Sequence, residues 1–217
     1  MEFAVSRNYI AGIRGLLHPG ADPYAKGEGV SAILRACLFG SAEALDMMAP
    51  ASPHGITSGD SVRESLEVIV LGSAYLLENI KQHAGNCENA KIATLKVLDK
   101  YKTIYYGDTG GLGQHTVLHY AALAGYPSVV NYLLSHTPSK QYIDVRCYDR
   151  TPLIDVIKMG YRDVFQVLLH HGADVHLTFL AWDNINYIHI CVLAGHRDLF
   201  FPEHLLKHGV QIDRVGN

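Results

Sequence analysis

Charge of one sign and long apolar segments are both scarce in this 217-residue sequence. The chain has 18 Lys and Arg residues against 21 Asp and Glu residues, so its formal net charge is only −3. A balance this close to neutral gives no electrostatic reason to bind nucleic acid or an anionic membrane, and we expect neither as a partner. No apolar run reaches membrane length, and we expect no signal peptide in this chain. We therefore expect an intracellular protein, cytoplasmic or nuclear.

Cysteine pairs and catalytic motifs are also missing. The four cysteines, Cys37, Cys87, Cys147 and Cys191, are far apart and form no CxxC pair, which favours a reducing compartment over a disulfide framework. Neither a GxSxG nor an HExxH motif is present. We expect no enzyme activity, no catalytic residue and no cofactor.

Two patterns that suggest ligand chemistry have simpler interpretations. The glycine-rich stretch GDTGGLGQHT lacks the GK[ST] ending of a phosphate-binding loop, so we interpret it as an ordinary loop. His170 and His171 are adjacent and would point apart on a helix, while His204 and His208 share a face but have no third ligand nearby. We expect no metal site.

What the sequence does contain is internal repetition. Gly125, Gly160 and Gly195 are spaced by 160 − 125 = 35 and 195 − 160 = 35 residues. The segments around them follow one pattern: TVLHYAALAGYPSVVNYLL, TPLIDVIKMGYRDVFQVLL and NYIHICVLAGHRDLFFPEHLL. Weaker copies centre on Gly40 and Gly72, which are 72 − 40 = 32 residues apart.

A half repeat precedes these copies. In SRNYIAGIRGLLHPGADP, Asn8 takes the place of the turn glycine, and Gly20-Ala21-Asp22 matches Gly172-Ala173-Asp174 further along the chain. We count about six repeats, the first of them partial, in a single array over residues 1–217.

The clearest repeat is TPLIDVIKMGYRDVFQVLLHHGADV, over 151–175. Thr151 and Pro152 are suited to start a helix, Gly160 to form a tight turn, and Gly172 to end the second helix in a left-handed conformation. Each helix carries one apolar face, made of Leu153, Val156 and Ile157 in the first and of Val164, Val167, Leu168 and Leu169 in the second.

This pattern resembles the ankyrin repeat in its TPL start, mid-repeat glycine and LLxxGAD end. The resemblance implies an all-α ankyrin-type solenoid of helix-turn-helix repeats with short hairpin loops. It also implies that His119 and His189, in the histidine place of TPLH, tie helix starts together by hydrogen bonds. Cys37 and Cys191 fall where the family has small residues, which implies buried packing.

The sequence departs from a regular array in two places. From Gly72 to Gly125 the interval is 125 − 72 = 53 residues, longer than the period of about 33. The surplus, about residues 86–111, contains KIATLKVLDKYKTIYY and predicts an extra or extended helix. In the sixth repeat, Pro202 falls inside the second helix and should kink or restart it.

Neither end of the sequence shows a clear polar capping repeat. Two interpretations stay open: a portion of a longer protein, or a short protein with degenerate caps.

The resemblance also predicts where a partner binds, because ankyrin arrays expose hairpin tips and the outward side of each first helix on a concave surface. We expect partner contacts from residues at these places: Trp182, Tyr120, Leu123, Tyr148, Arg150, Lys158, Met159 and Leu193. Further first-helix positions predicted to be exposed are Arg35, Leu38, Phe39, Glu67, Val70, Leu71, Asp155 and Ile190. Exposed apolar residues in such a cluster are typical of interfaces, and Trp, Tyr and Arg are enriched among the residues that dominate binding.

The sequence therefore predicts a monomeric scaffold that binds a protein of unknown identity through its concave face. The alternative is that the chain is the regulatory or substrate-recruiting portion of a larger enzyme.

Overall fold

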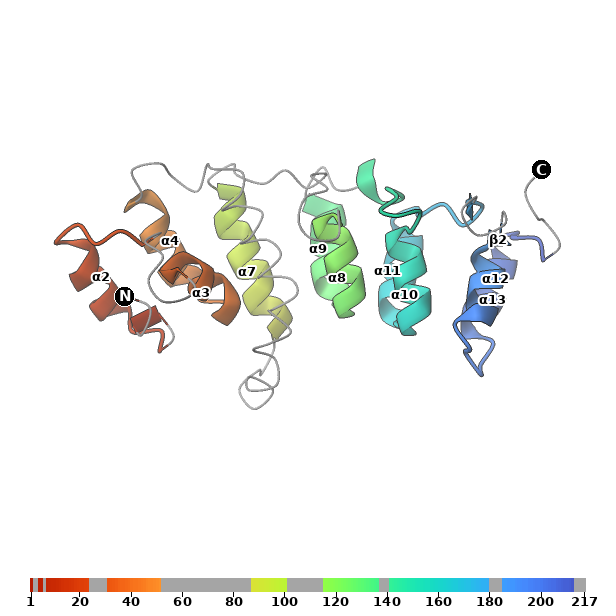
Figure 1. Ribbon diagram of the computed structural model, residues 1–217, viewed down its shortest axis with the longest axis horizontal. Coiled ribbons are helices and arrows are strands. Elements are labelled where there is room, and N and C mark those ends of the chain that lie inside the picture. The colour runs from red at the N-terminus through yellow and green to blue at the C-terminus, as the bar shows by residue number, and fades with distance from the viewer. Residues whose placement is uncertain are drawn as a thin grey trace. The chain divides into compact units, whose positions relative to one another are not determined.

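The computed structural model (Figure 1) describes most of the predicted repeats. The described residues are 1, 4–5, 7–23, 31–51, 87–100, 115–136, 141–179 and 185–212. The chain divides into two compact units, Met1–Tyr105 and Tyr106–Asn217, and we describe each by itself.

The first unit contains four described helices and one short 3-10 turn. These are α2 (Ile10–Leu17), α3 (Ala32–Phe39), α4 (Ala42–Met48), η1 (Ala49–Ala51) and α7 (Cys87–Lys100). Helix α4 packs against α2 on one side and α7 on the other. Helix α7 confirms the extra helix predicted in the region 86–111, and the rest of that region lies outside the described residues.

The described residues of the second unit form three helix pairs in succession (Figure 1). They are α8 (Val117–Ala124) with α9 (Pro127–His136), α10 (Pro152–Met159) with α11 (Arg162–His170), and α12 (Tyr187–Leu193) with α13 (Phe200–Lys207). Before α12 a small antiparallel hairpin joins β1 (Thr178–Phe179) to β2 (Ile185–Asn186). First helices pack on first helices, α8 on α10 and α10 on α12, and the second helix α9 packs on α11. This stacking confirms the all-α solenoid.

Glycines set the turn inside each pair, as the sequence predicts. Gly125 and Gly160 end α8 and α10 with φ angles of 72° and 78°, in the left-handed region that a side chain disfavours. Asn8, which takes the glycine place in the first half repeat, has a φ of 50°. Asparagine tolerates this conformation better than most residues, which explains the substitution.

Side-chain caps fix where the first helices begin. The hydroxyl oxygens of Thr116 and Thr151 accept hydrogen bonds from the backbone N–H groups of His119 and Ile154, as predicted for Thr151. In the last repeat the side-chain oxygen of Asn186 accepts from the N–H groups of Ile188 and His189. Each repeat of the second unit therefore starts its first helix with a polar side chain in a buried position.

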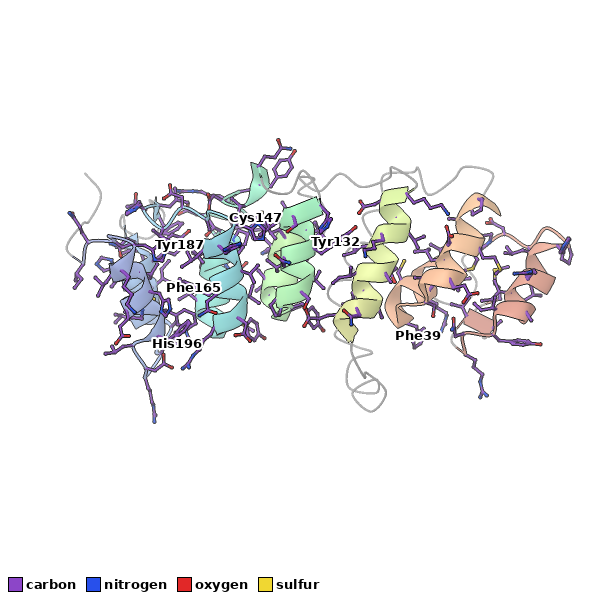
Figure 2. The ribbon with its side chains drawn as sticks, turned by 180° about the vertical axis from the view of Figure 1, so that it is seen from behind. Phe39, Tyr132, Cys147, Phe165, Tyr187 and His196 are labelled. Atoms are coloured by element: carbon purple, nitrogen blue, oxygen red, sulfur yellow. The ribbon has the colours of Figure 1, made fainter. Side chains whose placement is uncertain are left out.

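The core of the second unit is built from the inward faces of successive pairs. Phe165 of α11 is fully buried, and its ring centroid lies 5.1 Å from that of Phe201 in α13. The ring centroid of His196, which Figure 2 labels, lies 5.0 Å from that of Phe201. The Phe165 and Phe201 rings meet edge to face, while the His196 ring is tilted by 42° against Phe201. Aromatic rings packed in this way add to the stability gained from burial.

The last repeat is offset by two residues. The turn glycine and the stop glycine are 172 − 160 = 12 residues apart in the repeat of α10 and α11, but 209 − 195 = 14 apart in the last repeat, and all four have positive φ. Helix α13 consequently begins late, at Phe200, and Pro202 occupies its third position. This late start confirms the predicted restart of the helix. Proline costs little in the first turn, because an N–H group there has no partner within the helix.

Candidate partner-binding surface

The hairpin before α10 presents a tyrosine on a two-residue turn. Cys147 and Arg150 exchange both backbone hydrogen bonds, of 2.8 and 3.0 Å, so only Tyr148 and Asp149 form the tip. Both tip residues have positive φ, 51° and 58°, which is unusual for a bulky side chain. The strained turn directs Tyr148 into solvent, where it is 65% exposed as predicted.

Neighbouring hairpins are tied together in this region. The Arg146 guanidinium donates to the carbonyl oxygen of Thr178 in the following hairpin at 2.9 Å, and it also pairs with Asp149. The carboxylate of Asp144 accepts from the backbone N–H of Asp174 at 3.1 Å. Burial raises the pKa of Asp144, and the hydrogen bond from the Asp174 N–H opposes that shift. These bonds hold successive hairpins in a fixed relation, so a partner would meet a preformed surface.

The prediction that Asp155 is exposed is wrong. Its side chain is 0% exposed, because the Arg150 guanidinium folds over it and forms an ion pair with one carboxylate oxygen. Burial raises the pKa of Asp155, and the Arg150 charge opposes that shift. Arg150 therefore has an intramolecular role besides the partner contact predicted for it.

The other carboxylate oxygen of Asp155 is buried without a hydrogen-bond partner, as are Nε of Arg150 and Nε2 of His115. The His115 ring lies beside that of Tyr120, with centroids 5.6 Å apart. These four side chains form a polar cluster between α8, the hairpin and α10, a feature that sequence reasoning missed. The half-buried Tyr120 belongs to this cluster more than to an open surface.

Ile190 is also buried, not exposed as predicted, with 1% of its surface accessible. Ile190 and Asp155 occupy the same place in their repeats, 190 − 155 = 35 residues apart, and that place faces inward. The exposed place lies three residues further on, at Lys158 and Leu193, which is about 60° around the helix from the buried one. The predicted exposure is confirmed there, with Leu193 72% and Met159 52% exposed.

Two predicted residues meet at one pocket. A depression of about 280 Å³ between α10 and α12 is lined by Lys158, Ile190, Leu193 and Ala194. Leu193 and the buried Ile190 make it apolar, and Lys158 places a cation at its edge. This is the part of the described surface where the predicted residues converge.

The remaining predicted positions give a mixed result. In the first unit Phe39 is 38% exposed (Figure 2) and Arg35 is half-buried, while Leu123 of α8 is half-buried in the second unit. The other positions lie outside the described residues or have side chains that are not described: Trp182, Leu38, Glu67, Val70 and Leu71.

His119 has the structural role that the sequence predicts. Its Nε2–H donates to the carbonyl oxygen of Arg150 at 3.1 Å, so the Nδ1 of the neutral ring accepts from the Thr116 hydroxyl at 2.8 Å. Burial lowers the pKa of His119 from 6.5 to about 4. The side chain joins the start of α8 to the hairpin that precedes α10.

The thiols are buried and poorly suited to nucleophilic chemistry. Cys37 and Cys191 are 1% and 2% exposed, which confirms the predicted packing role. Burial raises the pKa of the Cys191 thiol to about 12, and it also raises the pKa of Cys147 (Figure 2). A thiol with a raised pKa carries little thiolate, the reactive form, near neutral pH.

Histidines of the last helix bond to their own backbone. Nδ1 of His204 donates to the carbonyl oxygen of Phe200, and Nδ1 of His208 donates to that of His204, both at 2.7 Å. Within the described ranges no three His, Cys, Asp or Glu side chains are placed to hold a metal ion. The helices that the structure describes include none with the length and apolar character needed to cross a membrane.

Comparison with known proteins agrees with the repeat pattern. The sequence model of the family described as "Ankyrin repeats (3 copies)" matches residues 75–179. Among solved structures, the chain is similar to the crystal structure of the ankyrin repeat domain of Bcl-3, which is described as a unique member of the IkappaB protein family. The two share 16% sequence identity and a TM-score of 0.68, over 97% of this chain and 86% of that one. No curated protein sequence gives a significant match.

Proposed function

We propose that this chain, whose repeats match the ankyrin-repeat model and fold, is a scaffold that binds a protein partner through the outward side of its first helices and its hairpin tips. The observation that carries the proposal is the pocket between α10 and α12. Leu193 lines the pocket and exposes apolar surface there, and Lys158 lines its edge. Isolated apolar side chains on a surface need no explanation, but an exposed leucine at an apolar pocket indicates an interface, and the exposed Met159 follows Lys158 directly in α10.

The pocket favours a partner of defined chemistry. An apolar side chain would fill the depression over Ile190, and a neighbouring carboxylate of the partner would lie close to the Lys158 ammonium group. Tyr148, on its strained hairpin, would supply an aromatic contact at the edge of the same surface. Tyr120, Leu123 and Arg150 would contribute where the polar cluster borders it, and Trp182 belongs to the proposed surface as a sequence prediction.

Binding through a preformed surface incurs little ordering cost, which is the advantage of a rigid array. The proposal extends to one continuous array of about six repeats, located in the cytoplasm or nucleus. Cys37, Cys147 and Cys191 are buried free thiols, which is consistent with a reducing compartment. Should residues 1–217 be the recruiting portion of a larger enzyme, the same surface would hold its substrate or regulator.

The test is a capture experiment from lysate with three forms of the chain. Leu193→Glu places a charge at the edge of the apolar pocket, while Gln166→Glu adds the same charge on an exposed position of α11. A protein retained by the wild type and by Gln166→Glu, but lost with Leu193→Glu, supports the surface. Equal retention by all three, with circular dichroism unchanged, rejects it.

A further inference from the structure

The two ends of the described array present unequal surfaces. The residue three places before each turn residue is at most 1% exposed in four of the five described repeats, at Val5, Cys37, Ala122 and Ile157. The fifth, Val192 in the last repeat, is 74% exposed. A β-branched apolar side chain in an otherwise buried position marks a stacking face that lacks its cover.

A ring from the following repeat covers the turn glycine inside the second unit. A Cβ atom on Gly125 would come within 2.9 Å of the Tyr161 ring, and one on Gly160 within 3.2 Å of the His196 ring. Both rings follow a turn glycine directly. At Gly195 none of the described residues comes within 4 Å of the corresponding position, although its φ of 72° matches the other two. The turn at Gly195 therefore leaves open the position that a ring covers at Gly125 and Gly160.

The last repeat also exposes other apolar side chains. Leu199, Leu206 and Ile212, which follow Val192 in the last repeat, are all exposed. Together with Gly195 they define what we call the tail face: Val192, Gly195, Leu199, Leu206 and Ile212.

The first half repeat carries an aromatic ring, that of Tyr9, suited to cover such a turn glycine. Tyr9 follows the turn residue Asn8, as Tyr161 follows Gly160, and both tyrosines precede their helix with nearly equal backbone angles. The φ and ψ angles are −83° and 81° at Tyr9, and −84° and 87° at Tyr161. Their N–H groups bond to the carbonyl oxygens five residues earlier, of Ala4 and Val156.

Unlike Tyr161, Tyr9 covers no turn glycine among the described residues. Its ring lies over Gly12 of its own helix, and the side chain is 61% exposed. Leu16, seven residues further on and hence two turns along the same side of α2, is also exposed. Tyr9, Gly12 and Leu16 form what we call the head face.

We propose that copies of this chain associate head to tail, with Tyr9 of one copy packed over Gly195 and Val192 of another. The occupant is a second copy because one chain holds both halves of the contact. Tyr9 has the backbone conformation of Tyr161 but covers no turn glycine, and Gly195 is a turn glycine that no ring covers. A head-to-tail contact that does not close produces chains of copies, not a defined dimer. This proposal departs from the monomer expected from the sequence.

Two variants separate the halves of the contact. Val192→Glu charges the tail face at an exposed site and leaves the head face intact. Tyr9→Ser removes the ring but keeps a residue that already serves before a helix in the next repeat, at Ser41. Met159→Glu is the matched control, since it charges an exposed apolar site on the proposed partner surface and not on either end face. Circular dichroism and thermal unfolding establish that all three are folded.

Sedimentation velocity over a wide range of protein concentration gives the result. The wild type and Met159→Glu should increase in mass with concentration beyond a dimer, while association of each end variant weakens by about tenfold or more. When mixed, the two end variants should form a complex of one copy of each that grows no further, because each retains the face that the other has lost.

A wild type that stays monomeric overturns the proposal, as does an end variant that still forms long assemblies or a mixture that forms no complex. The scaffold function is tested separately, since it depends on Leu193 and not on the head and tail faces.

Discussion

The imidazole of His119 and the carbonyl oxygen of Arg150, 31 residues further along the chain, form a 3.1 Å hydrogen bond that links one repeat to the next. The ring is fully buried, and its second nitrogen accepts from the Thr116 hydroxyl. This arrangement suits only the neutral imidazole in one tautomer.

Stability should therefore fall as the solution is acidified. The pKa of His119 is lowered from 6.5 to about 4, so between these values the unfolded chain binds a proton that the folded chain does not. The stabilisation is complete above pH 6.5 and is lost progressively as pH falls towards 4, by up to about 3 kcal/mol. Urea unfolding followed by circular dichroism at several pH values measures this loss.

His119→Gln keeps a donor for the Arg150 carbonyl oxygen but cannot titrate, so its unfolding free energy should depend less on pH. The exposed His170→Gln on α11 is the control and should keep the full dependence. The buried Asp155 carboxyl, whose raised pKa acts in the opposite direction, is present in both variants and does not affect the comparison. Equal pH dependence in all three chains would contradict the assignment.

The next repeat junction uses a different bond. Repeat five has Ile154 where repeat four has His119, and its link to repeat six is a 2.8 Å hydrogen bond between the hydroxyl groups of Thr151 and Tyr187. Both residues are 0% exposed, and burial raises the pKa of the Tyr187 phenol far above its usual range. The two junctions therefore join neighbouring repeats through hydrogen bonds made by unrelated side chains.

Tyr187→Phe tests this junction, because it removes the hydroxyl group and keeps the ring against Phe179. It should lower the unfolding free energy by about 1–2 kcal/mol, the cost of leaving a buried partner unsatisfied. Tyr148→Phe, which removes a hydroxyl group from an exposed tyrosine, should change the free energy little. Denaturant unfolding of the two variants gives the comparison, and an equal effect would show that the Thr151 bond contributes nothing.

The backbone conformation of Tyr148 should lower the unfolding free energy of the chain. Its φ of 51° is unfavourable for a tyrosine, whereas asparagine adopts such a conformation more readily. Tyr148→Asn should raise the unfolding free energy by about 1 kcal/mol. If the proposed surface is correct, the same change weakens capture of the partner. A variant that is no more stable than the wild type would mean that the turn carries no strain at this position.

Local signals made the turns and helix starts predictable from the sequence. Glycine and threonine act through their own backbone or side chain, so Gly160 and Thr151 needed no tertiary context. The stop at Gly172 and the substitution at Asn8 followed from the same chemistry. Helix α7 was predictable because its apolar spacing is local as well.

Features that depend on contacts in the folded chain were not predictable in this way. Asp155 is buried because Arg150 folds over it, and Tyr187 finds its hydroxyl partner 36 residues away. The left-handed turn at Tyr148 contains no glycine or asparagine from which it could be predicted. Exposure of Val192 depends on what stacks against its repeat, which no pattern within that repeat reveals.

The position of Pro202 in α13 gives a final test of the offset in the last repeat. Because the helix begins at Phe200, the N–H group that alanine would add at 202 falls in the first turn. Pro202→Ala should therefore change the unfolding free energy by less than about 0.5 kcal/mol, whereas relief of a mid-helix proline would stabilise by about 3 kcal/mol. The contrasting variant is Glu203→Pro, which adds a second proline ring one residue on and removes the 2.9 Å bond from the Glu203 N–H to the Leu199 carbonyl oxygen. It should destabilise the chain strongly, and a large stabilisation by Pro202→Ala in denaturant unfolding would place the start of α13 earlier in the sequence.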